Sequence, residues 1–327
     1  MSILITGSAG HLGEALMRTL RTAGRPAKGI DIKASPFTDY VGSIGDRDFI
    51  RQHMRGIKSV IHAATLHKPH VATHTNQDFI DTNLTGTLVL LEEAVAAGVG
   101  SFIFTSTTSA FGSALTPAPG EPAAWVTEEV IPIPKNIYGV TKVAAEGLCE
   151  LFFRKHRLPV IVLRTSRFFP EADDDAAIRG KYGIANTQAN EMLYRRVDIE
   201  DIVSAHLLAM EKAPHLGFGR YIISATTPFT REDLTSLRAN APQVVSRLFP
   251  EAEALFAMQN WTLFPHIDRV YVNQLAMKDL EWRPKYDFQH VLHCLRTEKD
   301  FRSPLAIEVG SKGYHSTLFE HGPYPVE

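Results

Sequence analysis

The sequence has few of the features that mark disulfide-bonded or membrane-spanning proteins. Among its 327 residues there are two cysteines, Cys149 and Cys294, which lie far apart in apolar helical contexts. This favours two buried thiols in a reducing compartment over a disulfide, and it predicts a cytoplasmic location. Nowhere do about eighteen apolar residues run together, so we expect no membrane-spanning helix.

The sequence also has no strong excess of either charge. It contains 34 basic and 36 acidic residues, and its formal net charge is −2 at pH 7. We therefore expect no surface for nucleic acid or for an anionic membrane, and the expected partner is a small molecule. Residues 2–6 already have the pattern of a strand that leads into a glycine turn, which leaves no room for a signal peptide. A soluble protein is predicted.

What the sequence does contain is a regular alternation of short apolar strands and amphipathic helices. This alternation predicts an α/β fold built from right-handed βαβ units, with a doubly wound parallel sheet. The expected strands are 3–6, 28–32, 59–62, 102–106, 160–164 and 220–224, and the expected helices are near 12–23, 46–54, 79–97, 137–156 and 199–211. We expect a sheet domain from 1–165 plus 198–224. A smaller, discontinuous substrate lobe, 166–197 plus 225–327, is expected over the carboxyl ends of the strands.

A glycine-rich turn follows the first expected strand. Gly7, Gly10 and Gly13 occupy the three glycine positions of a G-x-x-G-x-x-G spacing, with His11 and Leu12 before the third. The first glycine permits the tight turn, the second lets the main chain approach a pyrophosphate, and the third lets the helix pack closely on the strand. The N–H groups at the start of the helix bind the anion. The pattern predicts a dinucleotide-binding Rossmann domain.

Three further residues are candidates for binding the adenosine half of the dinucleotide. Asp31, at the end of the second strand, is placed to accept hydrogen bonds from the ribose hydroxyls and would repel a 2′-phosphate. NAD is therefore the predicted cofactor, although the nearby Lys33 keeps NADP open and Asp31 also fits a turn at a strand end. Ser43 and Ile44 are candidates for contacts with the adenine amine and ring.

A second motif pairs a tyrosine with a lysine. Tyr138 and Lys142 lie four residues apart on the expected helix 137–156 and share one face. A tyrosine that titrates near pH 10 works as a base at neutral pH only if a neighbouring cation favours the phenolate, and Lys142 provides such a charge. The same spacing also occurs in ordinary surface pairs. The strand 102–106 runs into the hydroxyl-bearing Thr107 and Thr108, which predicts hydrogen-bond donors at the ligand-binding edge of the sheet.

In this order, the motifs resemble those of the extended short-chain dehydrogenases/reductases. Within these enzymes the similarity is to the NAD-dependent epimerase/dehydratase family, typified by UDP-galactose 4-epimerases. It rests on the glycine turn 6–13, on His62-Ala63-Ala64, on Asn83 within 83–87, on the Ser/Thr strand end and on Tyr138-x-x-x-Lys142. The resemblance covers residues 1 to about 224 closely and the remainder loosely.

The resemblance implies a role for each residue of the motifs. Thr107 would hydrogen-bond the reacting oxygen, Tyr138 would be the acid/base, and Lys142 would bind the nicotinamide ribose. Tyr138 would take the proton of a substrate hydroxyl while a hydride passes to the nicotinamide, or would run the reverse reaction. The resemblance also implies four residues on the cofactor side, of which the last is more a brace than a reactant: His62, Ala63, Ala64 and Asn83.

The sequence departs from the family at the substrate side. Dehydratases follow the catalytic Thr with Asp-Glu, whereas this chain has Thr108 and Ser109, so we expect no dehydration. Arg167 stands where epimerases usually have an asparagine that binds the sugar diphosphate. It either binds a carboxylate or phosphate of the substrate or pairs with the acidic run 173–175.

Several other residues are candidates for contacting the substrate. Arg195 or Arg196 is a second anion-binding candidate, and His67 and Lys68 lie in the loop 66–74 that follows the expected strand 59–62. Four histidines crowd residues 62–74, but without a carboxylate or thiol in register we expect no metal site.

The leading functional hypothesis is an NAD-dependent enzyme that acts on a hydroxyl or keto carbon of a sugar-like substrate, with nucleotide sugars among the candidates. The alternatives are a carbonyl reductase or alcohol dehydrogenase for a smaller substrate, and a dinucleotide-sensing regulator without turnover. Such regulators typically lack the tyrosine or the lysine, and this chain has both. The helices near 79–97 and 137–156 resemble the family's dimer-forming pair, so a homodimer is expected.

Overall fold

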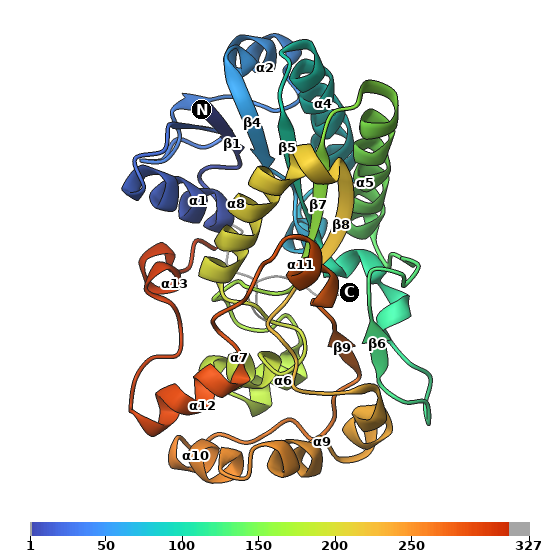
Figure 1. Ribbon diagram of the computed structural model, residues 1–327. Coiled ribbons are helices and arrows are strands. Elements are labelled where there is room, and N and C mark those ends of the chain that lie inside the picture. The colour runs from blue at the N-terminus through green and yellow to red at the C-terminus, as the bar shows by residue number, and fades with distance from the viewer. Residues whose placement is uncertain (1, 314–327) are drawn as a thin grey trace.

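The computed structural model describes residues 2–313, and a seven-stranded sheet forms its centre. The strand order is β3-β2-β1-β4-β5-β7-β8, and every neighbouring pair is parallel (Figure 1). The strands are β1 (Ser2–Thr6), β2 (Ala27–Asp31), β3 (Tyr40–Val41), β4 (Ile57–His62), β5 (Ser101–Thr107), β7 (Val160–Thr165) and β8 (Phe218–Ile223). The order reverses on either side of β1, so the predicted doubly wound Rossmann sheet is confirmed.

Helices cover both faces of the sheet, because successive strand side chains point to opposite sides. On one face, Ile3 and Ile5 belong to a core with α1 (His11–Thr22) and α8 (Ile199–Leu216). On the other face, Leu4 belongs to a core with α2 (Arg47–Met54), α4 (Gly86–Ala96) and α5 (Ile137–His156). Asn136 accepts a hydrogen bond from the Gly139 N–H and caps α5, whose bounds are those that the sequence predicted.

The expected single helix 79–97 is wrong in detail. The chain forms a short helix α3 (Asn76–Phe79), a π-helical segment η2 (Ile80–Thr85) and then α4. The wider π turn changes the phase of the helix at Asn83. Asn83 is thereby buried, and its contacts belong to the site described below.

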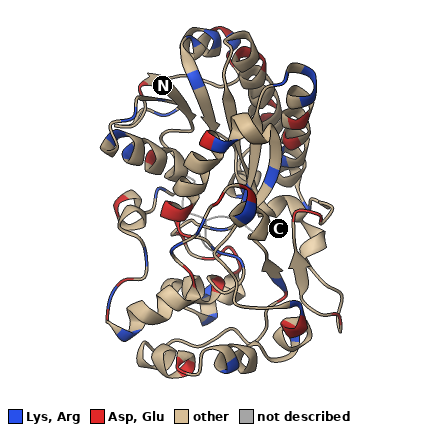
Figure 2. Ribbon diagram, in the orientation of Figure 1, with Lys and Arg blue, Asp and Glu red and all other residues tan. Residues whose placement is uncertain are grey.

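A second group of elements lies beyond the carboxyl ends of the strands and has its own apolar core. Its helices are α6 (Ala176–Lys181), α7 (Ile184–Glu191), α9 (Leu234–Leu248), α10 (Ala252–Met258) and α12 (Phe288–Arg296). A small parallel sheet joins β6 (Ala124–Val126) to β9 (Arg269–Tyr271). Along the described residues, basic and acidic positions are interspersed over both groups of elements (Figure 2).

The C-terminal part of the chain does not stay in this second group. Ala276 of α11 (Gln274–Asp279), Trp282 and Val309 of α13 (Pro304–Val309) all belong to the core around α1 and α8. The division into 1–165 plus 198–224 and 166–197 plus 225–327 stays a prediction. Within residues 2–313, none of the helices combines the length and the apolar character required to cross a bilayer.

Candidate active site

A cavity of about 1820 Å³ opens at the carboxyl ends of the strands, where the second group of helices faces the sheet. It brings together most of the residues that the sequence predicted. Those that line it are Gly7, Gly10, His11, Leu12, Gly13, Asp31, Ser43, Ile44, Ala63, Ala64, His67, Lys68, Thr107, Thr108, Tyr138, Lys142, Arg167 and Arg195. Three of the candidates do not line it: His62, Asn83 and Arg196.

The glycine turn between β1 and α1 leaves no space for side chains at two positions. Gly7 has φ +75°, and a Cβ built there would lie 2.7 Å from the Ala64 nitrogen. A Cβ on Gly13 would lie 1.9 Å from the Gly7 oxygen. Gly10 is the N-cap of α1. No side chain at these glycines therefore separates the main chain of the turn and the start of α1 from the cavity. Such an accessible main chain fits the pyrophosphate of a dinucleotide.

Asp31 ends β2 at the wall of the same cavity. Its Oδ2 accepts a hydrogen bond of 3.0 Å from the Ala9 N–H, and its Oδ1 accepts one of 2.9 Å from the Lys33 N–H. These two main-chain donors fix the carboxylate beside the glycine turn. Ile44 packs against Gly86, where a Cβ would lie 2.7 Å from the Ile44 Cδ1. A carboxylate held in this place can accept hydrogen bonds from ribose hydroxyls, which fits the adenosine half of NAD.

His62 is buried beneath the glycine turn and does not line the cavity, although the resemblance placed it on the cofactor side. Its Nδ1 lies 2.7 Å from Thr6 Oγ1, and its Nε2 lies 3.0 Å from Thr87 Oγ1. Burial, with a smaller effect of the Lys142 charge, lowers the pKa of His62 to about 3. Thr6 Oγ1 accepts hydrogen bonds from the N–H groups of Ala63 and Ala64. The neutral imidazole is thus hydrogen-bonded to Thr6, which in turn fixes the main chain of Ala63 and Ala64 at the cavity wall.

Asn83 braces the site, as the resemblance implied, but it does not line the cavity itself. Its Oδ1 accepts hydrogen bonds of 2.8 Å from Thr65 Oγ1 and from the Leu66 N–H. Its Nδ2 donates to the Leu66 oxygen at 3.0 Å and to Thr141 Oγ1 at 3.1 Å. The four bonds use the capacity of the amide and tie the loop after β4 to α5.

Thr107 and Tyr138 meet at the junction of β5 and α5. Burial raises the pKa of Tyr138 to about 12, and a hydrogen bond with Thr107 opposes the shift. Lys142 Nζ donates a 2.6 Å hydrogen bond to the Thr105 oxygen and lies 4.1 Å from the centre of the Phe104 ring. Burial lowers the pKa of Lys142 to about 7. The pKa of Tyr138 is thus set by burial and by the hydrogen bond with Thr107. The sequence had predicted that the charge of Lys142 would lower it.

The remaining predicted hydroxyl and the loop after β4 complete this end of the cavity. Thr108 donates a 3.4 Å hydrogen bond to the Thr165 oxygen. His67 precedes the short helix η1 (Lys68–Ala72), and its ring centre lies 6.2 Å from that of Tyr138 and 5.6 Å from that of Phe169. Burial lowers the pKa of His67 to about 3. A neutral imidazole therefore stands beside the tyrosine.

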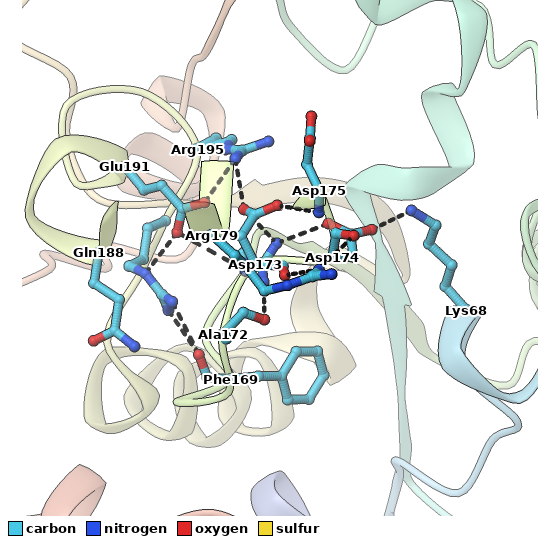
Figure 3. A network of polar contacts seen from close by, with 12 residues as sticks. Lys68, Phe169, Ala172, Asp173, Asp174, Asp175, Arg179, Gln188, Glu191 and Arg195 are labelled. Carbon is cyan, nitrogen blue, oxygen red and sulfur yellow. Dashed lines mark hydrogen bonds and ion pairs between the residues drawn. The ribbon is translucent and has the colours of Figure 1, made fainter. Parts of the chain in front are cut away.

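Figure 3 shows how the acidic run after β7 is neutralised by the chain itself. Arg167 Nη1 donates to Asp173 Oδ2 at 3.1 Å and to Asp174 Oδ1 at 3.3 Å. Arg195 Nη2 donates to the same Asp173 oxygen at 3.1 Å, and Lys68 Nζ is bonded to Asp174. Of the two alternatives for Arg167, the structure has the pair with the acidic run. The three cations predicted to bind the substrate all have carboxylate partners.

Glu191 of α7 adds a third carboxylate to Asp173 and Asp174 in this network. Its Oε1 lies 2.8 Å from Arg195 Nη2, and its Oε2 accepts a hydrogen bond of 2.9 Å from Arg196 Nε. Burial alone would raise the pKa of Glu191, but the nearby arginines hold it at about 2. Arg196 also donates both Nη groups to the Phe169 oxygen. Arg196 does not line the cavity, so of the two arginines only Arg195 remains an anion-binding candidate.

The far end of the cavity is lined by residues of the second group of elements, which the sequence did not predict. Arg238 on α9, together with His266 and Arg269, lines this end. The Ile267 N–H donates to the Leu237 oxygen at 2.9 Å, so the helix runs beside the segment that carries His266. Tyr182 and Phe264 form an aromatic pair there, with ring centres 4.7 Å apart. No local motif in the sequence joins these residues.

Comparison with known proteins identifies the family. Residues 3–223 match the NAD dependent epimerase/dehydratase family. The chain belongs to this family. The family that the sequence predicted, and its dependence on NAD, are thus confirmed.

The individual relatives include epimerases and dehydratases of nucleotide sugars. The chain is 30% identical to a UDP-glucose 4-epimerase of Streptomyces lividans over 247 residues, which are 64% of this chain and 72% of that one. It is 29% identical to a dTDP-glucose 4,6-dehydratase of Streptomyces antibioticus over 185 residues, or 51% and 53% of the two chains. The match spans 39%, 47% and 53% of the length of the first three curated relatives.

Solved structures share the fold. A UDP-glucose 4-epimerase of Thermotoga maritima with UDP-glucose superposes with a TM-score of 0.61 at 24% identity, over 91% of this chain and 99% of that one. A short-chain dehydrogenase/reductase superfamily protein of Agrobacterium tumefaciens with bound NAD superposes with a TM-score of 0.64 at 21% identity, over 94% and 99% of the two chains.

Proposed function

We propose that this protein is an NAD-dependent epimerase or oxidoreductase that acts on a hydroxyl or keto carbon of a sugar-like substrate. One observation carries the proposal: a single cavity is lined by the bare glycine turn, by Asp31 and by the hydrogen-bonded residues Thr107 and Tyr138. Cofactor site and acid/base thus face the same space, which hydride-transfer chemistry requires.

The residues that would hold NAD follow from the fit of the cavity. The main chain of residues 7–13 and the start of α1 would bind the pyrophosphate, and Asp31 would bind the adenosine ribose. Ser43 and Ile44 would flank the adenine, and Lys142 would reach the other ribose. When bound, NAD supplies the carbon that accepts and returns a hydride.

The proton is moved by Tyr138. With a pKa raised to about 12, the phenol is protonated at neutral pH and can donate to a substrate oxygen. To accept a proton it needs groups that favour the phenolate, and Thr107 provides one such hydrogen bond. Thr107 would also orient the reacting oxygen, and the neutral His67 would close this end of the cavity against water.

The far end of the cavity supports a phosphate-bearing substrate. Within residues 2–313, Arg238 has no carboxylate partner, and Arg269 has only Asp268, at 3.7 Å from its Nε. Guanidinium groups bind phosphates strongly, and an aromatic pair such as Tyr182 and Phe264 suits a nucleoside. We therefore propose a nucleotide sugar, with its phosphates at Arg238 and Arg269 and its sugar at Tyr138.

The test is an assay of the purified protein with NAD and a panel of UDP- and dTDP-sugars, free aldoses, uronates and simple secondary alcohols. Arg238→Ala and Arg269→Ala should raise KM for a nucleotide sugar about tenfold or more and leave kcat largely unchanged. Arg231→Ala is the matched control, because Arg231 packs on Trp125 and does not line the cavity. Absence of turnover on every member of the panel would contradict the proposal.

A reductase or dehydrogenase for a smaller substrate is the second candidate. It is favoured by the inner wall of the cavity, where Lys68 and Arg167 are paired with Asp173 and Asp174 and so are not available to a diphosphate. In that case the panel would show turnover on free aldoses, uronates or alcohols, and the Arg238 and Arg269 variants would keep the KM of the wild type.

A further inference from the structure

The end of the described chain returns to the cofactor turn. Helix α13 contacts α1 and α8, and in Figure 1 it lies beside α1 although the two are at opposite ends of the colour bar. Gly310, with φ +59°, ends α13 in a left-handed conformation that glycine adopts without strain. The next residues, Ser311–Gly313, line the cavity together with Gly10 and His11.

Glu171, in the loop after β7, connects this end of the chain to the turn. Its Oε1 lies 2.9 Å from His11 Nε2 and accepts hydrogen bonds of 2.8 Å from Ser311 Oγ and 3.2 Å from the Lys312 N–H. Lys312 Nζ in turn donates to Glu14 of α1. One carboxylate thus joins three segments that are distant in the sequence: the start of α1, the loop after β7 and the C-terminal segment.

The charge of Glu171 strengthens the hydrogen bonds of this junction at neutral pH. Burial alone would raise the pKa of Glu171, but its hydrogen bonds to His11 and Ser311 and the charge of His11 lower it to about 2. The carboxylate is therefore ionised, and charge-assisted hydrogen bonds are stronger than neutral ones. Phe169, two residues before Glu171, packs its ring 5.4 Å from that of His11 and 5.6 Å from that of His67. The junction is continuous with the wall beside Tyr138.

We propose that Ser311–Gly313 and Glu171 form a clasp that retains NAD in the cavity. The clasp lies against the segment whose main chain would bind the pyrophosphate, so a bound dinucleotide leaves only after these contacts open. Cofactor release is then slow compared with turnover, which suits a reaction that returns its hydride to the same substrate. The inference rests on the cofactor site proposed above and assigns a function to residues outside the family's motifs.

The experiment measures the rate at which NADH leaves the full-length protein, by stopped-flow fluorescence after mixing with excess NAD. Glu171→Ala removes the shared acceptor. The double variant Ser311→Ala/Lys312→Ala removes the two side-chain bonds of the C-terminal segment, to Glu171 and to Glu14, and keeps the Lys312 N–H. We expect each to release NADH about tenfold faster or more, since charge-assisted bonds are lost. Glu308→Ala is the matched control, because Glu308 pairs with Arg18 of α1 across the surface but does not line the cavity.

Release rates equal to that of the wild type in both variants, with unchanged melting temperatures, would overturn the clasp. If Glu171→Ala fails to fold, the double variant decides, because its two side chains lie at the surface end of the contact. Failure of the wild type itself to bind NADH would be a different result: it would overturn the cofactor site of the proposed function, and the clasp with it.

Discussion

Lys142 Nζ donates a 2.6 Å hydrogen bond to the main-chain oxygen of Thr105, two residues before Thr107 on β5. The bond ties the helix that carries Tyr138 to the strand that carries its hydrogen-bond partner. Lys142 therefore has a structural effect on the pair in addition to the ribose contact proposed for it. Removal of the lysine and removal of the phenol hydroxyl should have different consequences.

We expect Tyr138→Phe to abolish turnover and to leave NADH binding nearly intact, because only the proton transfer is lost. Loss of a positioned acid/base typically lowers kcat about 10²–10⁴-fold. Lys142→Ala should weaken NADH binding as well, and Thr107→Ala should have an intermediate effect on kcat. Steady-state kinetics, NADH titration and the melting temperature of each variant separate these outcomes. Wild-type activity in Tyr138→Phe would show that the acid/base has been misassigned.

We expect NAD(H) to bind more tightly than NADP(H), because a 2′-phosphate would lie beside the Asp31 carboxylate. That carboxylate is held by the N–H groups of Ala9 and Lys33 and cannot easily turn away. Asp31→Ala should narrow the ratio of the two dissociation constants, as measured by fluorescence titration. Asp48→Ala, at an exposed site on α2, should leave the ratio unchanged. Tighter binding of NADP(H) by the wild type would mean that Lys33 prevails over Asp31.

The stability of the fold should fall as the pH is lowered from about 6.5. Burial lowers the pKa of His62 to about 3 and that of His206 to about 4. The folded state then binds fewer protons than the unfolded state between these values and the unfolded pKa. Each histidine therefore contributes stability above pH 6.5 that is lost on acidification, at up to about 1.4 kcal/mol per pH unit.

Melting temperatures between pH 7.5 and pH 5 test this expectation. His206→Gln should show a shallower fall with pH than the wild type. His215→Gln, which changes an exposed histidine at the end of α8, should follow the wild-type curve. A melting temperature that stays flat down to pH 5 would contradict the assignment of neutral, buried imidazoles.

We expect a homodimer formed through α4 and α5. Val140, Ala144 and Gly147 are exposed along one side of α5, and a Cβ built on Gly147 meets no atom within 4 Å. Gly147→Arg is therefore compatible with a single chain but would place a charge in the interface. Light scattering should give twice the mass of one chain for the wild type and the mass of one chain for the variant. A monomeric wild type at micromolar concentration would refute the dimer.

The parts of the site that the sequence predicted well are those that depend on local pattern. The glycine turn and helix α5 each have a dense signal over a few residues, and both form where expected. The motif did not show that His62 lies outside the cavity lining, because a motif does not say which way a strand-end side chain points. In the sheet, His62 is in register with Thr6 and bonds to it inside the fold. The bracing role of Asn83 followed from the resemblance, whereas the π turn in which Asn83 lies has no sequence signature.

The parts that the sequence did not predict depend on contacts between distant segments. Arg167 allowed two readings because its distance from Asp173 and Asp174 is set by the loop after β7 and not by their spacing alone. Arg238 and Arg269 reach the same cavity because α9 is hydrogen-bonded to the segment 265–267, which directly precedes β9. The role proposed for Glu171 depends on its contacts with the C-terminal segment, and these contacts join residues about 140 positions apart in the sequence.

The pairing of β6 with β9 constrains the order in which parts of this protein can fold during synthesis on the ribosome. Strand β6 comes directly before the helix that carries Tyr138, but its partner β9 is encoded near the end of the described chain. The sheet domain can collapse early, whereas β6 stays unpaired until Tyr271 has left the ribosome. A nascent chain that stops before Arg269 should therefore have the cofactor-binding strands in place and an unfinished wall around the tyrosine.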